Sequence, residues 1–247
     1  MTFDQTTVIV AASLLLAAYV KGTTGFGFPL IATPTVALLL DIRTAVTILI
    51  IPNIVMDITQ IFRGTFSPSL FRRFSWLLAL TIVGVFLGTT VLVRLPIWLL
   101  NLTLGVMVLA FVGSNFLRLD FRVSPEIERF CSPLAGFVGG FLNGMTNAAG
   151  PVVATYLYSL RLEKTEFVKS IATIFMVTKL SQLVAVSTWN LFNLSTLSLS
   201  LVVTLFCLMG FYAGLKTQDR VNQKTFNRAL LILLFAIGVT LVARSLR

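Results

Sequence analysis

Apolar stretches separated by short polar segments recur along the whole chain. Ten of these stretches predict helices, at residues 6–20, 28–40, 44–62, 74–93, 97–117, 131–142, 151–161, 166–188, 195–215 and 227–243. A full membrane span needs about 20 mostly apolar residues, and six of the ten meet or approach that length. The other four are short and come as two consecutive pairs. The pattern predicts an all-α polytopic membrane protein.

Each short pair is interrupted by a break that is rich in Gly, Thr and Asn. The breaks read Gly22-Thr-Thr-Gly-Phe-Gly-Phe-Pro29 and Gly144-Met-Thr-Asn-Ala-Ala-Gly-Pro151, and an offset of 122 residues carries the first onto the second. The same offset pairs four further positions: Asp41 with Glu163, Gln60 with Gln182, Gly88 with Gly210 and Arg94 with Lys216. This register predicts a duplication, with a first membrane repeat at 1–117, a cytoplasmic linker at 118–129 and a second repeat at 130–247.

Composition excludes several classes of protein. The chain of 247 residues is 57% hydrophobic and only 11% charged, with a mean hydropathy of +0.95, whereas soluble domains carry about 25% charged residues. A soluble enzyme is therefore excluded. The net charge of +10 does not indicate nucleic acid, because most Lys and Arg residues lie in the short gaps between apolar runs. With no His and no metal-ligand spacing at Cys131 and Cys207, we expect neither a metal nor a cofactor.

The first apolar stretch is predicted to stay in the mature protein. Residues 1–7 contain Asp4 but no Lys or Arg, so the positive leading segment of a cleaved signal peptide is missing. An uncharged or acidic leading end also favours an N-terminus outside the cell.

The positive charges favour an inverted arrangement of the two halves. If each short pair returns to the side where it began, the halves are inverted, and thirteen positive loop charges fall on one side of the membrane and four on the other. If each pair is instead one broken span, the halves are parallel, and the positive loop charges divide eight to nine. Since the positive-inside rule expects asymmetry, we predict inverted repeats with both termini outside. Whether the short pairs are re-entrant or fully spanning is left open. The minority side would carry Arg43, Arg94, Arg244 and Arg247.

The two breaks are the predicted binding site. Irregular backbone at membrane depth is tolerated where it lines a cavity or is buried in protein, and broken helices in inverted repeats build the binding sites of many secondary transporters. Helices that begin near Pro29 and Pro151 would direct free N–H groups into the breaks, which favours an anion. The alternative is that the glycines only permit tight turns and close packing. The candidate substrate-binding residues are Lys21, Gly22, Thr23, Thr24, Gly25, Phe26, Gly27, Asn143, Gly144, Met145, Thr146 and Asn147.

Three charges lie inside apolar stretches, where an ionised side chain costs about 2.5–3.5 kcal/mol on insertion scales. Lys21 stands at the first break, where an anion would neutralise it. Asp57 and Lys179 occupy equivalent positions in the two halves and are candidates for a proton-coupling carboxylate and an anion-attracting ammonium. The alternatives are mutual neutralisation or snorkelling to an interface. We interpret Gln60 and Gln182 as helix–helix hydrogen-bond partners.

Two segments resemble a known family. Lys21-Gly-Thr-Thr-Gly-Phe-Gly-Phe-Pro-Leu-Ile-Ala-Thr-Pro34, with Asp41-Ile-Arg-Thr-Ala-Val46 and Ile51-Pro-Asn53, resembles the first half of the TauE/SafE sulfite exporter family. The run from Gly140 to Ala154 is similar to its second-half motif. The resemblance implies a transporter of the bacterial inner membrane for sulfite, thiosulfate, sulfonates or related organic anions.

The predicted function is export of a small sulfur-containing or organic anion by a secondary transporter in the lipid bilayer, with proton coupling through Asp57 as a further hypothesis. A passive anion channel, and a membrane enzyme or subunit of a larger complex, are the alternatives. The chain has no Gly-x4-Gly-Lys-Ser/Thr motif, so we do not expect an ATP-driven pump. The substrate's identity, the direction of flux and the oligomeric state are left open.

Overall fold

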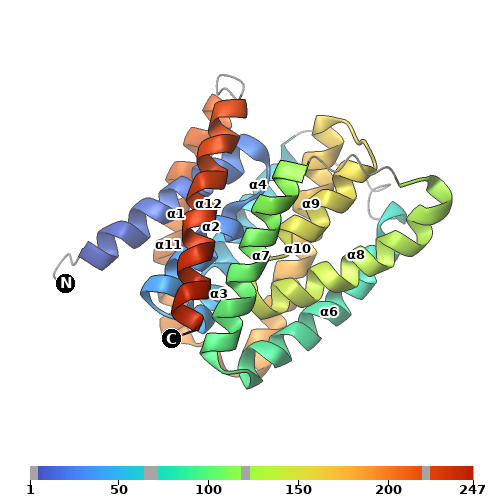
Figure 1. Ribbon diagram of the computed structural model, residues 1–247. Helices are drawn as coiled ribbons and strands as arrows, with labels where there is room; N and C mark the ends of the chain where they lie inside the picture. The colour runs from blue at the N-terminus through green and yellow to red at the C-terminus, as the bar shows by residue number, and fades with distance from the viewer. Residues whose placement is uncertain (1–4, 64–71, 118–122, 219–222, 247) are drawn as a thin grey trace.

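The protein is a bundle of α-helices. The computed structural model describes residues 5–63, 72–117, 123–218 and 223–246, and these ranges contain no strand. The helices are α1 (Gln5–Thr24), α2 (Phe28–Leu39), α3 (Ile42–Ile48), α4 (Ile50–Phe62), α6 (Ser75–Arg94), α7 (Ile97–Leu117), α8 (Pro125–Thr146), α9 (Gly150–Ser159), α10 (Lys164–Thr188), α11 (Leu194–Thr217) and α12 (Gln223–Ser245) (Figure 1). Six segments within the described ranges are long and apolar enough to cross a membrane, which confirms the polytopic membrane fold.

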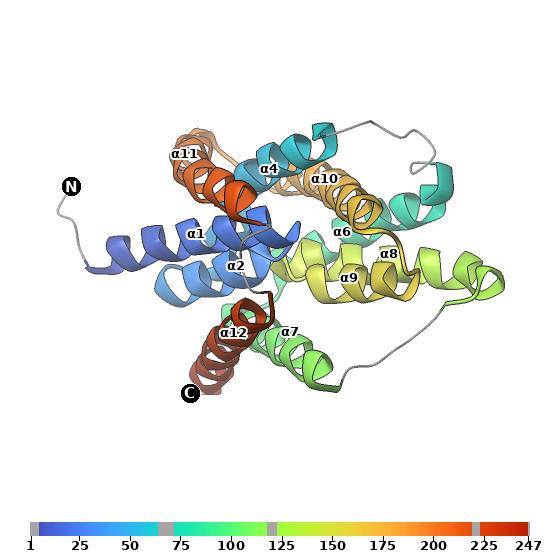
Figure 2. The same ribbon diagram turned by 90° about the horizontal axis from the view of Figure 1, so that it is seen from above.

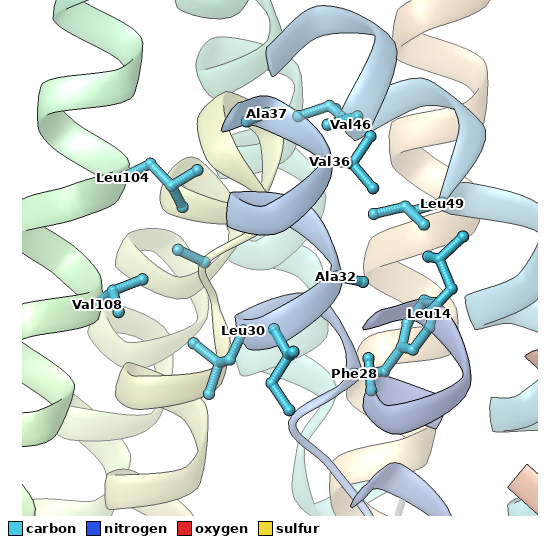
Figure 3. Close-up of a cluster of buried hydrophobic side chains, with 14 of the residues drawn as sticks. Leu14, Phe28, Leu30, Ala32, Val36, Ala37, Val46, Leu49, Leu104 and Val108 are labelled. Carbon is cyan, nitrogen blue, oxygen red and sulfur yellow. The ribbon is translucent and has the colours of Figure 1, made fainter. Parts of the chain in front are cut away.

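The helices form three layers. Seen from above, the pairs α1/α2 and α8/α9 form a middle layer and approach each other end to end near the centre (Figure 2). Helices α4, α6, α10 and α11 lie on one side of this layer, and α7 and α12 lie on the other. The largest hydrophobic cluster surrounds α2, whose buried side chains include Phe28, Leu30 and Val36 (Figure 3). It packs between Leu14 and Leu49 on one side and α7 on the other.

Two of the four helices predicted to be short are long. The prediction of 6–20 and 131–142 was wrong in length, because α1 and α8 run to 20 and 22 residues. Both continue into the breaks as far as Thr24 and Thr146, whose hydroxyls donate to the carbonyls of Val20 and Leu142 in their own helices. Only α2 and α9 are short, with 12 and 10 residues.

The predicted helix 44–62 is two helices that meet at Leu49. Pro52 explains the interruption, because a proline ring clashes with the carbonyl four residues earlier, which is that of Ile48, and provides no N–H for it. The second half has Ile174 at the equivalent position, and α10 is continuous over 25 residues.

Helix boundaries recur at the predicted offset. Helices α1 and α8 end at Thr24 and Thr146, α2 and α9 begin at Phe28 and Gly150, and α3 and α10 begin at Ile42 and Lys164, each pair 122 positions apart. The equivalent helices α7 and α12 run in opposite directions, since Gly105 faces Leu241 and Val242 while Gly238 faces Leu109. Helix α8 begins at Pro125, inside the segment predicted as a linker; residues 118–122 of that segment lie outside the described residues.

The two halves interlock rather than forming separate bodies. Helix α1 packs along α11, and α8 packs along α6. Gly136, Gly140 and Gly144 of α8, spaced four apart, face the backbone of α6 so closely that a Cβ atom on each would lie 2.2–2.3 Å from a carbonyl oxygen. Such small-residue spacing lets helix backbones approach directly, and without a side chain between them the helices gain van der Waals contact. We call these contacts the glycine seams; Gly22, Gly210 and Gly214 form the one between α1 and α11.

The glycine seams correct one part of the sequence register. Gly84 and Gly88 of α6 face the carbonyls of Phe137 and Phe141, whereas Gly210 and Gly214 of α11 face those of Leu15 and Tyr19. Because Leu15 and Phe137 are themselves 122 positions apart, as are Tyr19 and Phe141, Gly210 is equivalent in packing to Gly84. The sequence pairing of Gly88 with Gly210 is therefore wrong by one helical turn.

A single methyl group in the α6–α8 seam should destabilise the protein. In Gly140→Ala, the new Cβ atom would lie 2.3 Å from the Thr81 carbonyl oxygen, so the two helices must separate. We expect a loss of at least about 1–3 kcal/mol, as for other overpacked interiors, measured as a lowered Tm in detergent. Gly113→Ala is the matched control: a Cβ atom added there would have no neighbour within 4 Å, so the change should leave Tm unchanged or raise it. An equal response of the two variants would contradict the seam.

Candidate functional site

The end of α1 carries a buried lysine that is paired with α4. Lys21 Nζ donates a hydrogen bond to Asp57 Oδ1 at 2.6 Å and another to Asn53 Oδ1, and all three side chains are withdrawn from solvent. Asn53, Asp57 and Gln60 lie on one face of α4, at the spacing of four and three residues that brings side chains above one another. The ion pair neutralises Lys21 within the protein, whereas the sequence analysis expected an anion to do so.

The end of α8 carries the corresponding cluster with α10. Lys179 Nζ donates to Asn147 Oδ1 at 2.6 Å and to Gln182 Oε1 at 2.7 Å, while Asn143 Nδ2 donates to the same Gln182 oxygen at 3.0 Å. Lys179 is 1% exposed. Within the described ranges no carboxylate lies at ion-pair distance from it, so its two hydrogen-bond partners are neutral amides.

The two clusters occupy equivalent positions in the repeat but differ in which residues are charged. Gln60 Nε2 donates to the Lys21 carbonyl at 3.2 Å, and Gln182 Nε2 donates to the Asn143 carbonyl at 2.9 Å, so the same interhelical hydrogen bond occurs twice. This confirms the interpretation of both glutamines as helix–helix partners. At the remaining equivalent positions Lys21 corresponds to Asn143, and Asp57 corresponds to Lys179. A carboxylate–ammonium pair in the first half is thus replaced by an amide–ammonium pair in the second.

The clusters together form one buried polar centre between α1, α4, α8 and α10. We define the polar centre as the following eight residues: Lys21, Asn53, Asp57, Gln60, Asn143, Asn147, Lys179 and Gln182. Helix α4, which carries Asp57, packs on α10, which carries Lys179. With both lysines and Asp57 ionised, the polar centre carries one more positive than negative charge.

Each break contacts the other half of the molecule. Gly25 and Asn147, 122 positions apart, both adopt a left-handed backbone conformation, with φ of 89° and 61°. Each faces the other half at equivalent residues: a Cβ atom on Gly25 would lie 2.9 Å from Val168, and Asn147 Nδ2 lies 3.4 Å from the carbonyl oxygen of Val46. Glycine and asparagine are the residues that adopt this conformation at least cost, which explains their choice at the helix ends.

A cavity of about 760 Å³ leads to the first break. Thr23, Thr24, Phe26 and Gly27 line it, together with the first turns of α2, the C-terminal part of α9 and parts of α7 and α12. Its polar wall residues include Ser114 and Asn115 near the end of α7 and Arg161 after α9. Neither Lys21 nor Lys179 is among the lining residues, so the polar centre is closed from this cavity in the conformation described.

The remaining predicted site residues have structural partners. Gly22 and Gly144 lie in the glycine seams, where their missing side chains serve helix packing. Met145 is 5% exposed and belongs to the hydrophobic core. Thr23, like Thr24 and Thr146, donates to a carbonyl of its own helix. The structure therefore brings together Lys21, Asp57, Asn143, Asn147 and Lys179 and assigns packing or backbone roles to most of the others.

Two of the four arginines predicted for the minority side contact helix ends; Arg247 lies outside the described residues. Arg43 donates to the carbonyls of Leu92, Val93 and Leu95 at the end of α6, and Arg244 donates to the carbonyl of Leu38 at the end of α2. These contacts satisfy carbonyls that a helix end leaves without partners. Asp41 caps α3 by accepting from the Thr44 N–H, whereas Glu163 makes no side-chain cap on α10.

Sequence reasoning missed Asn53 as a partner of Lys21 and the pairing of Lys21 with Asp57. The signal was present in the spacing of Asn53, Asp57 and Gln60, which places three polar side chains on one face of an otherwise apolar helix. Snorkelling of Asp57 and Lys179 is contradicted, because both side chains are fully buried.

The fold and the polar centre define a multi-pass helical membrane protein in which two interrupted helix pairs surround buried charges, an arrangement of the transporter type. The profile of the family described as "Sulfite exporter TauE/SafE" matches residues 10–241, nearly the whole chain. The chain belongs to this family, which confirms the resemblance seen in the sequence and makes it an anion-exporter-type membrane transporter rather than a member of an enzyme family. No curated protein and no solved structure matches it.

Proposed function

We propose that the protein is a secondary transporter that exports a small sulfur-containing or organic anion, of the sulfite, thiosulfate or sulfonate class, across the bacterial inner membrane. The observation that carries the proposal is a buried lysine without an acidic partner. Lys179 has two amides as its only hydrogen-bond partners among the described residues, and when protonated it gives the polar centre an excess positive charge. An unpaired charge in the membrane interior is costly, and a substrate anion would supply the missing counter-charge.

The anion is held at the second break. Lys179 and Asn147 would contact it there, and the first turn of α9 would direct its free N–H groups toward it, since α9 begins at Gly150 with no side-chain cap. Asn143, which hydrogen-bonds Gln182, would hold the site in place from α8. Lys21 has a different role in this arrangement, because its charge is already balanced by Asp57.

Export requires loading from the cytoplasm. The cavity is lined by residues next to the segments that carry most of the positive charges, including Asn115, Arg161 and Leu230. Under the positive-inside rule that end is cytoplasmic, and both termini of the chain are outside. We infer that the conformation described is an inward-facing one and that the two halves are inverted repeats. Movement of the breaks would then connect the cavity to the polar centre.

Two unpartnered acceptors support proton coupling through Asp57. Asp57 Oδ2 and Gln60 Oε1 are buried and have no hydrogen-bond donor, although Asp57 Oδ1 accepts from Lys21. A proton on Oδ2 would turn one of these acceptors into a donor and would release Lys21 from its ion pair. Asp57 is therefore the residue at which a proton gradient can act on the charge balance of the polar centre.

Transport by the purified protein tests this function. In proteoliposomes, sulfite should accumulate against its gradient when a pH gradient is imposed, and uptake should saturate. Asp57→Asn should abolish the pH-driven accumulation while sulfite–sulfite exchange continues, because the amide keeps an acceptor for Lys21 but does not titrate.

Flux that only runs downhill and does not saturate would instead indicate an anion channel. No flux of any tested anion by the purified chain would indicate a subunit of a larger complex. Normal pH-driven accumulation by Asp57→Asn would remove this residue from the coupling mechanism.

A further inference from the structure

One buried hydroxyl group on α2 has no hydrogen-bond partner. Thr33 is fully buried, and its Oγ1 makes no hydrogen bond to any of the residues that the structure describes. Threonines in helices commonly donate to the carbonyl of the residue four positions earlier, as Thr24 and Thr35 do in this protein. A buried polar group without a partner raises the free energy of the folded state, so the position of Thr33 needs an explanation.

Thr33 has an equivalent in the second half that lies in opposite surroundings. The offset of 122 pairs it with Thr155 on α9, and both residues follow an alanine and lie four positions after the proline at the start of their helix. Thr155 is exposed and lines the cavity. The same hydroxyl group is therefore accessible in the second half and enclosed in the first.

Other residues that line the cavity also have buried equivalents. We define the seal as six buried residues whose equivalents in the other half line the cavity: Thr33, Val36, Ala37, Ala45, Val46 and Ala148. All but Thr33 belong to the largest hydrophobic cluster, and Figure 3 shows Val36, Ala37 and Val46 close together around the end of α2. Most of these side chains are smaller than their equivalents, so the surrounding helices pack closely where the other half leaves a cavity. Val36, for example, corresponds to Tyr158.

The seal lies on the opposite side of the breaks from the cavity. Helix α12 contributes Leu230, near its start, to the cavity, whereas Arg244, near its end, donates to the carbonyl of Leu38 at the end of α2. Helix α2 therefore leads away from the cavity, while α9 leads along it. Thr33 is thus on the side by which an anion loaded from the cavity would have to leave.

We propose that Thr33 lines an exit passage, which opens to the outside of the cell when the seal separates, and that its hydroxyl group there donates to the departing anion. The inference rests on the proposed transport function and identifies residues by which the anion leaves. With the seal open, Thr33 has the surroundings that Thr155 has in the conformation described, and its hydroxyl gains the partner that it lacks. The unpartnered hydroxyl raises the free energy of the closed seal and so brings the two conformations closer in free energy.

Thiol labelling from each face of the membrane tests the passage. Thr33→Cys and Thr155→Cys are labelled with a negatively charged, membrane-impermeant methanethiosulfonate in spheroplasts, which present the outer face, and in inside-out vesicles. We expect Thr33→Cys to react at least about tenfold faster from the outer face and Thr155→Cys at least about tenfold faster from the inner face, because each opens to one side. The unsubstituted protein, with Cys131 and Cys207, gives the background. Thr81→Cys is the matched control and should not react, since Thr81 is equally buried but lies in the α6–α8 seam.

A second variant reports on the cost of the buried hydroxyl. Thr33→Val keeps the shape of the side chain but removes the unpartnered group, so it should stabilise the closed seal and raise Tm in detergent. The maximal rate of sulfite transport in proteoliposomes should fall about fivefold or more, because the seal then opens less readily. Thr155→Val should leave Tm unchanged, because the Thr155 hydroxyl is already exposed.

The outcomes separate this inference from the proposed function. If Thr33→Cys transports sulfite but is labelled from neither face, or from the same face as Thr155→Cys, Thr33 does not line an exit passage and the inference fails alone. A lowered Tm in Thr33→Val would mean that the hydroxyl stabilises the closed seal, which also contradicts the inference. If the unsubstituted protein transports no anion, the proposed function itself fails.

Discussion

Introducing a copy of the first half's ion pair into the second half will weaken anion binding. The double variant Asn143→Lys with Lys179→Asp places a lysine and an aspartate at the positions that Lys21 and Asp57 occupy in the first half. The backbone supports this exchange, because Gln182 holds the carbonyl of residue 143 as Gln60 holds that of residue 21. The variant should fold, since its new pair is internally neutralised, but the polar centre no longer carries an uncompensated cation.

The expected loss in sulfite affinity is at least about tenfold to a hundredfold, since hydrogen bonds to charged groups contribute about 1.5–3 kcal/mol. Binding to the detergent-purified protein by calorimetry measures it, and Tm reports on folding. Arg94→Gln is the control: it also removes one positive charge, but from an exposed side chain at the end of α6. A folded double variant that binds sulfite as tightly as the native protein would exclude Lys179 as the anion contact.

Removing Lys21 alone will destabilise the protein more than removing the whole ion pair. Lys21→Met leaves Asp57 buried without its hydrogen bond from an ammonium. Breaking a buried pair by removing one partner typically costs about 3–5 kcal/mol, whereas replacing both partners by apolar groups is often nearly neutral. We therefore expect Lys21→Met with Asp57→Leu to recover most of the stability lost in Lys21→Met.

The free energy of unfolding in mixed micelles, measured for both single variants and the double variant, gives the coupling between the two residues. Lys216→Met, at the end of α11 and outside the polar centre, controls for the loss of a lysine. If the changes in the free energy of unfolding of the two single variants are additive, the two residues are not coupled. Asp57 would then have no place in the proposed mechanism.

The sequence predicted the outline of the fold and the location of the breaks, because both depend on local signals. Pro29 and Pro151 mark the first turns of α2 and α9, and Gly25 and Asn147 mark the left-handed residues at which α1 and α8 stop. Helix lengths were underestimated where polar residues continue a helix. The run of apolar residues predicted that the first helix ends at residue 20. Helix α1 instead continues through Lys21, whose side chain has its hydrogen-bond partners on α4.

Interactions between the two halves were the part that sequence could not supply. An offset of 122 aligns positions along the chain but does not say which helix packs on which. Asp57 and Lys179 are equivalent in the repeat, yet Asp57 pairs with Lys21 of its own half. The one-turn shift in the glycine seams has the same origin, since Gly210 is matched to Gly84 by the helix it contacts and not by its position in the sequence.

The glycine seams have a consequence for how such a chain arose and how it assembles. Helix α1 of the first half packs against α11 of the second, and α8 of the second half packs against α6 of the first, so neither half can form these contacts alone. A single-copy ancestor would have needed a second copy of itself to form the same contacts. In the present protein the seam of α1 can form only after α11 has been synthesised, whereas the partners of Lys21 on α4 are available much earlier.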